Sequence, residues 1–326
     1  MELSFSVETW PVRAGFAISR GAVKEAQVVV ATIRDATYQG RGECVPYQRY
    51  GDTVGSVQSQ ISSVRVAIEA GAGRDELQKL LPAGAARNAL DCALWDLEAK
   101  QKSKTIWELV GIKNPRPMPT CFTISLDAPE AMAEQAKKVA KQYPVLKIKL
   151  GADGDEERLR KIREAAPEAR LIVDANEGWN ENNIDAMLRA CESAGVELLE
   201  QPVPAEYSNI LKNVRTSILL CADESAHTSA DIEKLTNRYG AVNIKLDKTG
   251  GLTEALAMAK RAREAGLSVM VGCHVSTSLS MAPATVVAQY ADYVDLDGPL
   301  LLERDREPHI EYRDGMIRPT TPELWG

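Results

Sequence analysis

Residues 145–176 read VLKIKLGADGDEERLRKIREAAPEARLIVDAN. An apolar run rich in Val, Ile and Leu comes first, over residues 145–151, followed by polar residues and then by a helical pattern over residues 155–166. A second apolar run, over residues 170–176, completes the unit. A strand, a helix and a second strand in this order predict a βαβ crossover, in which the two strands are parallel.

This unit repeats along the chain from about residue 117 onward. The strand-like runs cover residues 119–126, 145–151, 170–176, 196–202, 218–224, 241–248, 267–273 and 293–298. The helical patterns between them cover residues 129–143, 155–166, 182–195, the segment after Tyr207, 230–240, 252–266 and 279–292. Eight strands alternating with helices favour a closed (β/α) barrel over an open, doubly wound sheet, for which no GxGxxG motif follows the first strand.

Both ends of the chain depart from this pattern. After the eighth strand, Pro299, Pro308 and Pro319 interrupt any helix, so we expect a (β/α)7β barrel, a TIM-like α/β fold. The first 115 or so residues instead show strands followed by helices, which predicts a separate α+β domain. Its strands are expected over residues 3–12 and 26–46, with Gly40 and Gly42 in a turn, and its helices over residues 56–71 and 85–102.

Composition limits the classes of function. The 326 residues include 44% hydrophobic and 26% charged side chains, which are ordinary globular values. The formal net charge of −7 argues against a nucleic-acid partner, which requires a basic surface. No apolar run is long enough for a transmembrane helix, and the first residues do not resemble a signal peptide. Six scattered cysteines predict reduced core thiols in a cytoplasmic protein.

Two lysines interrupt the second expected barrel strand. Lys147 and Lys149 are two residues apart, so the side-chain period of a strand places both on one face. On an antiparallel surface sheet such a pair would only mark a solvated face. The strands of a parallel barrel are covered on both sides, so these lysines are candidates for a functional site.

Acidic residues end three consecutive expected strands. Asp174, Glu200 and Asp223 each follow an apolar run. A single acid in this place usually caps the next helix. Three such acids converge on the mouth of the barrel, where barrel enzymes have their active sites. Without a nearby set of His or Cys, they suit an oxygen-ligated cation, with Mg²⁺ expected first.

Two further strands carry charges. Lys245 lies in the sixth expected strand, across the barrel from Lys149, where it is either an ion-pair partner or a base. Asp295 and Asp297 end the eighth strand two residues apart, which favours either a solvated turn or a binding site for a cationic group.

These residues match a known pattern. The set Lys147-x-Lys149, Asp174, Glu200, Asp223-Glu224-Ser225 and Lys245 resembles the muconate-lactonizing subgroup of the enolase superfamily. That superfamily joins an α+β capping domain to a (β/α)7β barrel. The resemblance therefore implies a capping domain over residues 1–115, completed by residues 300–326, and a barrel over residues 116–299. GECVPYQRYG, LPAGAARNALDCALWDL, LIVDANEGW, LLEQPVP, ADES, VNIKLDKTGGLTEAL and DLDGP further resemble the L-Ala-D/L-Glu dipeptide epimerases.

The resemblance assigns roles to the remaining candidates. It implies that Asp295 and Asp297 hold the α-ammonium group of a dipeptide, and that Arg20 meets the side-chain carboxylate of Glu. It also places Thr123 and Cys273, with Lys147, among the substrate-binding residues. His274 departs from the pattern, because related epimerases often have Met there, and we expect no strand-six Asp to form a catalytic dyad with it. His227 and His309 are expected in polar surface loops.

The implied mechanism removes the α-proton next to a carboxylate, through an enediolate. Mg²⁺ on Asp174, Glu200 and Asp223 would stabilise that charge, as enolase-superfamily sites do in general. Lys149 and Lys245 would act as bases on opposite faces, and Lys147 would remain charged. Crowding of the two bases by Lys147, by each other and by the cation, with partial desolvation, is expected to bring the pKa of one base to about 7–8. Loops around Arg20 and residues 47–51 of the capping domain would close the site.

Three functions are therefore compared. The first is epimerisation of L-Ala-D-Glu and L-Ala-L-Glu in murein peptide recycling, by a cytoplasmic enzyme whose homo-oligomeric state stays open. The second is another activity of the subgroup: o-succinylbenzoate synthase, N-acylamino-acid racemase or cycloisomerase. Their substrates carry no α-ammonium group, so Asp295 and Asp297 argue against them. The third is a barrel that binds a metal and a ligand without turnover, for which two opposed lysines would be unnecessary.

Overall fold

The computed structural model describes residues 1–13, 17–18 and 21–326. Its central feature is a sheet of eight strands, in which every strand pairs with its neighbours in sequence and each of these pairs is parallel. The strands are β7 (Phe122–Ile124), β8 (Val145–Lys149), β9 (Arg170–Asp174), β10 (Val196–Glu200), β11 (Leu219–Ala222), β12 (Ala241–Ile244), β13 (Ser268–Gly272) and β14 (Tyr293–Asp295). The sequence predicted all eight.

The first and last strands meet and close the barrel. Cys121 N, immediately before β7, donates a hydrogen bond to Val294 O of β14 at 2.9 Å. The strands are buried almost throughout, because helices cover one side and the barrel core fills the other. The structure therefore confirms the barrel and excludes the open sheet.

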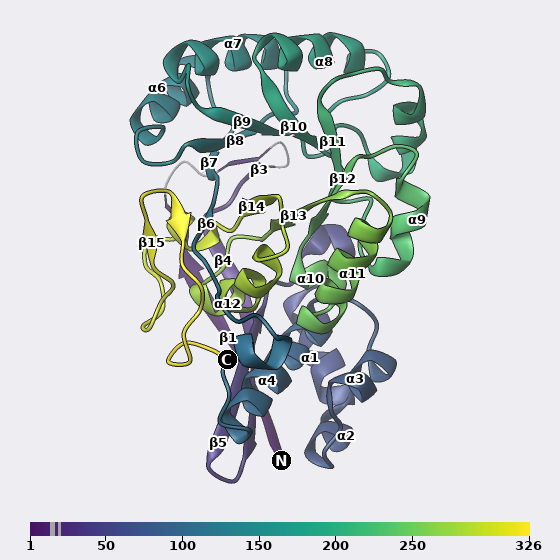
Figure 1. The fold of residues 1–326 in the computed structure, drawn as a ribbon, viewed down its shortest axis with the longest axis vertical. Helices are drawn as coiled ribbons and strands as arrows, with labels where there is room; N and C mark the ends of the chain where they lie inside the picture. Colours follow the sequence, from purple (N-terminus) through teal and green to yellow (C-terminus); the bar gives the residue numbers. More distant parts are fainter. Residues whose placement is uncertain (14–16, 19–20) are drawn as a thin grey trace.

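Helices surround the barrel, and α6, α7 and α8 line one side of it (Figure 1). Regular helices follow most strands: α6 (Pro129–Val139), α7 (Asp155–Ala165), α8 (Ile184–Ser193), α11 (Leu252–Glu264) and α12 (Ser278–Ala288). Each turns apolar residues inward, as Leu159 and Ile162 of α7 do. After β14 the described chain forms a 3₁₀ turn, Gly298–Leu301, and two short strands, β15 (Tyr312–Arg313) and β16 (Met316–Ile317), but no α-helix, which agrees with a missing eighth helix.

Two expected helices are shorter than their patterns. The segment after Tyr207 belongs to a 3₁₀ helix, Ala205–Asn213. Residues 230–240 contain only the four-residue α9 (Ile232–Leu235), preceded by a 3₁₀ turn, Ser229–Asp231. A second short helix, α10 (Leu246–Thr249), follows β12 before α11. Short helices of this kind lack the repeated apolar spacing that makes a longer helix recognisable.

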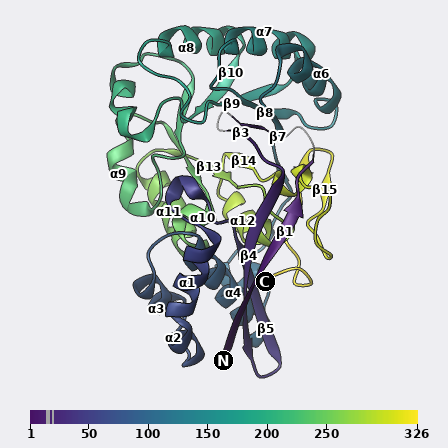
Figure 2. The ribbon, with the colours of Figure 1, turned by 180° about the vertical axis from the view of Figure 1, so that it is seen from behind.

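The N-terminal part is an α+β domain, as expected. Its antiparallel sheet has the order β1 (Glu2–Pro11), β4 (Glu25–Asp35) and β5 (Tyr38–Cys44), and a two-stranded pair, β2 (Ala17–Ile18) and β3 (Gly21–Ala22), lies apart from it. The helices are α1 (Val54–Ser63), α2 (Arg65–Glu69), α3 (Arg74–Leu80), α4 (Ala85–Gln101) and α5 (Ile106–Val110). The pattern over residues 56–71 thus forms two helices. Figure 2 shows β1, β4 and β5 as a long ribbon extending from the barrel beside α4.

Gly40 and Gly42 lie inside β5, and their expected position in a turn is wrong. A Cβ atom on Gly40 would lie 2.1 Å from Ala93 O, and one on Gly42 would lie 2.2 Å from Ala89 O. Both acceptors are backbone atoms of α4, so the strand and the helix are in direct backbone contact. The two glycines are required by this close approach.

The C-terminal segment returns to the N-terminal domain. Glu303 N donates to Pro11 O at 2.9 Å, and Trp325 Nε1 donates to Cys92 O at 3.1 Å. Gly326 N donates to the Asp96 carboxylate at 2.8 Å. Both chain ends accordingly lie on the side of the molecule away from α6–α8 (Figures 1 and 2). None of the helices in the described ranges has the length and apolar character needed to cross a bilayer.

We expect Gly42→Ala to reduce the free energy of unfolding by about 1–3 kcal/mol or more, because the new methyl group would collide with backbone atoms of α4 that cannot move independently. Urea denaturation measures the change. Gly55→Ala is the matched control, since a Cβ there meets nothing closer than 4.0 Å and the residue lies in helix α1. Equal stability of the Gly42 variant and the wild type would contradict direct strand–helix contact.

Candidate active site

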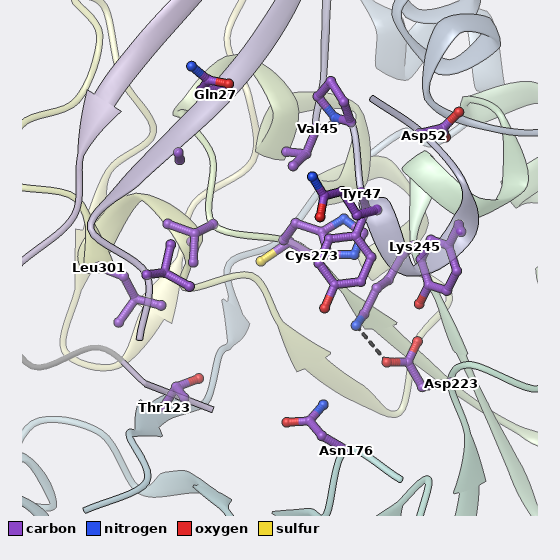
Figure 3. A pocket seen from close by; sticks show the side chains of 18 of the residues that line it. Gln27, Val45, Tyr47, Asp52, Thr123, Asn176, Asp223, Lys245, Cys273 and Leu301 are labelled. Carbon is purple, nitrogen blue, oxygen red and sulfur yellow. Dashed lines mark hydrogen bonds and ion pairs between the residues drawn. The ribbon is translucent and has the colours of Figure 1, made fainter. Parts of the chain in front are cut away.

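A cavity of about 590 Å³ opens at the carboxyl ends of the barrel strands. Residues of both domains line it. Tyr47 and Tyr50 come from the loop after β5, whereas Lys147, Lys149 and Lys245 come from the barrel. Figure 3 shows Tyr47 beside Lys245 and Cys273, with Thr123 and Asn176 across the cavity.

Strand register brings the three predicted acids to this end. Asp174, the last residue of β9, is the register partner of Lys149 on β8 and of Glu200 on β10. Asp223 directly follows β11. All three carboxylates are buried. The expectation that three acids converge on the barrel mouth, rather than only capping helices, agrees with this placement.

Lysine ammonium groups lie between these acids. Lys149 Nζ is 2.6 Å from Asp174 Oδ2, and Lys245 Nζ is 2.7 Å from Asp223 Oδ2. Lys147 Nζ lies 2.7 Å from Glu200 Oε2. The three acids of neighbouring strands are therefore flanked by lysines, and the two outer lysines, Lys149 at the end of β8 and Lys245 directly after β12, come from strands on opposite sides of the barrel.

Burial and charge shift the pKa values of this cluster. Desolvation disfavours the charged form of Lys245, but Asp223 and Glu200 outweigh it and raise its pKa well above the usual range. The pKa of Lys147 is raised in the same way by Asp295, Glu200 and Asp174. The expectation that one base has a pKa of about 7–8 includes the charge of a bound cation, so it stays a prediction.

The carboxylates show the complementary shifts. Desolvation, and then the charge of Asp174, raise the pKa of Glu200 to about 7. Desolvation also acts on Asp174, but Lys149 and Lys147 outweigh it and lower its pKa. Glu200 is thus the acid that gains most from a further positive charge nearby.

The donor set fits a hard divalent cation. As the side chains stand, no three acidic, His or Cys groups in the described ranges are gathered tightly enough to hold a metal ion. Asp174, Glu200 and Asp223 nevertheless offer only oxygen donors from three neighbouring strands. Glu200 Oε2 is buried and accepts no well-directed hydrogen bond from the described residues. These are the properties expected of ligands for Mg²⁺.

Lys248 is a buried member of the cluster that sequence analysis missed. Its Nζ donates to Asp223 Oδ1 and Asp223 O at 2.6 Å, and to Asn243 O at 2.9 Å. It therefore fixes the orientation of the Asp223 carboxylate. The IKLDK stretch contains it, but it lies on the short α10, outside the strand alternation that identified the other lysines.

Asp295 and Asp297 have different partners. Asp295 Oδ2 pairs with Lys147 Nζ at 2.6 Å, and its Oδ1 accepts from Cys121 Sγ at 3.1 Å. Asp297 Oδ2 accepts from Thr123 N at 2.7 Å. Desolvation, and then Asp295, raise the pKa of Asp297. Both carboxylates line the cavity, but only Asp295 is neutralised by a lysine at hydrogen-bond distance.

His274 has an acidic partner after all. Its Nδ1 lies 3.0 Å from Asp247 Oδ2, which corrects the expectation that no strand-six Asp would pair with it. Asp247 lies on α10, immediately after β12, and its Oδ1 also accepts from Val45 N and Asn88 Nδ2 of the N-terminal domain. Desolvation lowers the pKa of His274. This histidine lines the cavity.

The other expected residues fall into three groups. Thr123 and Cys273 line the cavity as expected, the former through the end of β7. Arg20 lies outside the described residues. His227 is not a free surface residue, since its ring packs edge-on against Tyr50 at 5.0 Å between centroids, whereas His309 is exposed. Tyr47 and Tyr50 line the cavity and belong to the loop over residues 47–51 that was expected to close the site, whereas Asn176 is a cavity residue that was not identified.

Comparisons with known proteins agree with this architecture. Residues 131–323 match the Enolase C-terminal domain-like family, and residues 1–111 match the N-terminal domain of the mandelate racemase / muconate lactonizing enzyme family. The L-Ala-D/L-Glu epimerase of Escherichia coli K12 is 45% identical, with 95% of this chain and 97% of the relative aligned. The N-acetyl-D-glutamate racemase of a Pseudoalteromonas species is 43% identical, with 92% and 95% aligned.

Solved structures give the same result. An enolase family member from Agrobacterium tumefaciens with homology to dipeptide epimerases, solved with bound sodium and L-Ala-L-Glu, is 49% identical and has a TM-score of 0.98 over 99% of each chain. A dipeptide epimerase from Methylococcus capsulatus, complexed with Mg and L-Arg-D-Lys, is 32% identical, with a TM-score of 0.91 over 99% of this chain and 98% of that one. The chain belongs to the enolase superfamily, to its mandelate racemase and muconate lactonizing enzyme group, and within that group to the dipeptide epimerases.

Proposed function

We propose that this protein inverts the α-carbon of the C-terminal residue of a dipeptide, with L-Ala-D-Glu and L-Ala-L-Glu as its substrates. The observation that carries the proposal is the pair Lys149 and Lys245, buried at one cavity but on opposite sides of the barrel. Epimerisation needs a proton donor and a proton acceptor on the two faces of one carbon. The relatives from Escherichia coli and Agrobacterium tumefaciens support the choice of substrate.

Each lysine would serve one epimer. The lysine on the face of the α-proton removes it as a neutral amine, and the other delivers a proton to the opposite face as an ammonium group. Lys147, buried against three carboxylates, keeps its positive charge and faces the negative charge that develops on the substrate carboxylate. The two outer lysines exchange roles in the reverse direction.

The cofactor in this proposal is one Mg²⁺ per site, held by Asp174, Glu200 and Asp223. When bound, the cation would take the α-carboxylate of the substrate and, as a nearby positive charge, favour the neutral form of a lysine. The proposal is supported by the all-oxygen donor set and by the Mg complex of the relative from Methylococcus capsulatus. In a cell-wall context the reaction would serve the recycling of murein peptides in the cytoplasm.

A second candidate is racemisation of an N-acylated glutamate. It is favoured by the 43% identity with the N-acetyl-D-glutamate racemase. The proton transfer would be the same, and only the group on the α-nitrogen would differ. Asp297 favours the dipeptide, because a carboxylate beside a cationic α-ammonium group is stabilised, whereas an acetyl group offers no charge to pair with it.

Removal of divalent metal should abolish epimerisation, because Asp174, Glu200 and Asp223 are proposed to act through the bound cation. When EDTA-treated, dialysed protein is mixed with L-Ala-L-Glu, the ellipticity of the dipeptide, followed by circular dichroism, should hardly change. Added Mg²⁺ should restore the rate of epimerisation. Full activity in protein shown by elemental analysis to lack metal would contradict the proposal.

Lys149→Ala and Lys245→Ala should each lower net epimerisation by about 100-fold or more, the usual contribution of a general acid or base. In D₂O, each variant should still exchange the α-proton of one epimer, and the two variants should prefer different epimers. Proton NMR with L-Ala-D-Glu and L-Ala-L-Glu measures both effects. Lys137→Ala, at an exposed position on α6, is the control.

Exchange of the same epimer by both lysine variants would refute the assignment of one lysine to each face. Near-normal epimerisation by either variant would refute it as well.

Asp297→Asn should lower kcat/KM for L-Ala-L-Glu about 10- to 100-fold, the range expected for a hydrogen bond to a charged group, but change that for N-acetyl-L-Glu little. Asp295→Asn should lower kcat/KM for both substrates, because Asp295 Oδ2 holds Lys147, which serves either substrate. Parallel assays of both variants with both substrates measure the selectivity ratio. An unchanged ratio in Asp297→Asn would show that Asp297 does not recognise the ammonium group.

A further inference from the structure

A short loop of the N-terminal domain covers part of the cavity. It contains Tyr47, the 3₁₀ turn Gln48–Tyr50 and Gly51. The Tyr47 ring stacks on His274 at 4.3 Å between centroids, and both Tyr47 and Tyr50 line the cavity. The position of this loop therefore determines the shape of the cavity wall on the side of Lys245.

Between these tyrosines, Arg49 reaches across to the barrel domain. Its Nε donates to Glu177 Oε2 and its Nη2 donates to Glu177 Oε1, both at 2.8 Å. Two parallel hydrogen bonds between a guanidinium and a carboxylate fix direction as well as distance. These hydrogen bonds to Glu177 are the main reason that the pKa of Arg49 is raised.

Glu177 is held rigidly by the barrel. It follows the β9 strand that ends in Asp174, and its Oε1 also accepts a hydrogen bond from Ala205 N at 2.9 Å. Its own backbone N–H donates to Gln201 O at 2.9 Å. Its φ of +65° lies in the left-handed region, which a residue with a side chain adopts only where its surroundings enforce it. These contacts hold the Glu177 carboxylate in place independently of Arg49.

This pair differs from an ordinary surface ion pair. The Glu177 side chain is only 9% exposed, whereas that of Arg49 is 38% exposed, and the two residues belong to different domains. Each is next in the sequence to residues that line the cavity, Gln48 and Tyr50 for Arg49 and Asn176 for Glu177. Exposed ion pairs contribute little to stability, because water competes for both partners and because two long side chains must be ordered. Here Glu177 is already desolvated and fixed, so most of the free-energy cost of ordering this partner is absent.

We propose that Arg49 and Glu177 form a latch, in which they act as positioning residues that hold Tyr47 and Tyr50 against the barrel mouth and so set how tightly substrate is retained. Neither residue is proposed to touch a reacting atom. Breaking the latch should therefore weaken substrate binding more than it slows proton transfer. The kinetic part of the inference rests on the proposed dipeptide epimerisation.

The first experiment compares kinetic constants of Arg49→Met, Glu177→Gln and the double variant with L-Ala-L-Glu. Each single variant should raise KM about five- to tenfold, the effect of one favourable ion pair, with kcat within about twofold. The double variant should be no worse than the poorer single one, because both changes break one interaction. Independent, additive losses, or a loss in kcat alone, would overturn the latch.

The chain offers a matched control at the other end of β9, the strand that precedes Glu177. Arg170, the first residue of β9, makes a comparable pair with Glu197, with Nη2 2.8 Å from Oε2. That pair lies away from the cavity. Arg170→Met should therefore leave KM and kcat unchanged, and an effect equal to that of Arg49→Met would overturn a specific role for the latch.

A second readout needs no activity. Hydrogen–deuterium exchange of the metal-loaded protein, followed by mass spectrometry, reports opening of the loop through the amides of Tyr50, Gly51 and Asp52, which donate within it. Arg49→Met should accelerate their exchange at least about fivefold, and Arg170→Met should not. If the wild type epimerises no dipeptide, the proposed function fails while this exchange still decides the latch, and wild-type protection in Arg49→Met overturns it.

Discussion

The fold is organised around charges that are buried at the mouth of the barrel. Each would be costly alone, since moving one ion out of water costs several kcal/mol even after relaxation. Pairing of opposite charges offsets this cost, because each carboxylate lies next to an ammonium group at 2.6–2.7 Å. The arrangement requires several strand ends to be placed together, which a closed parallel barrel provides. Its members are Lys147, Lys149, Asp174, Glu200, Asp223, Lys245, Lys248 and Asp295.

The N-terminal domain completes this arrangement by excluding water from one side. Asp247 connects the two domains, since it accepts hydrogen bonds from Val45 N, Asn88 Nδ2 and the ring of His274. Arg49 and Glu177 form a second connection on the other side of the loop. The barrel therefore supplies the charged groups, and the domain above it sets how far they are exposed to solvent.

Strand periodicity made most of this site predictable. Lys147 and Lys149 interrupt an apolar strand at a spacing of two, and Asp174, Glu200 and Asp223 end three consecutive strands, so their positions follow from the fold class alone. Other features depend on contacts between distant segments. Lys147 and Asp295 are 148 residues apart, and the backbone contact of Gly40 and Gly42 with α4 appears only after packing. No local pattern encodes such pairs, which is why Asp295 was expected to meet only substrate.

Asp295, the last residue of β14, and Asp297, two residues after it, differ in a way that would let the proposed chemistry accept different substrates. Asp295 pairs with Lys147, so in the proposed mechanism it would support proton transfer whichever substrate is bound. Asp297 forms no ion pair with a lysine among the described residues, and it accepts hydrogen bonds from both the backbone amide and the side chain of Thr123 while lining the cavity. The carboxylate of Asp297 alone would then distinguish an ammonium group from an acylated nitrogen. The two relatives of similar identity, an L-Ala-D/L-Glu epimerase and an N-acetyl-D-glutamate racemase, are consistent with such a small change, because the lysines and the acids proposed to bind the metal need not move.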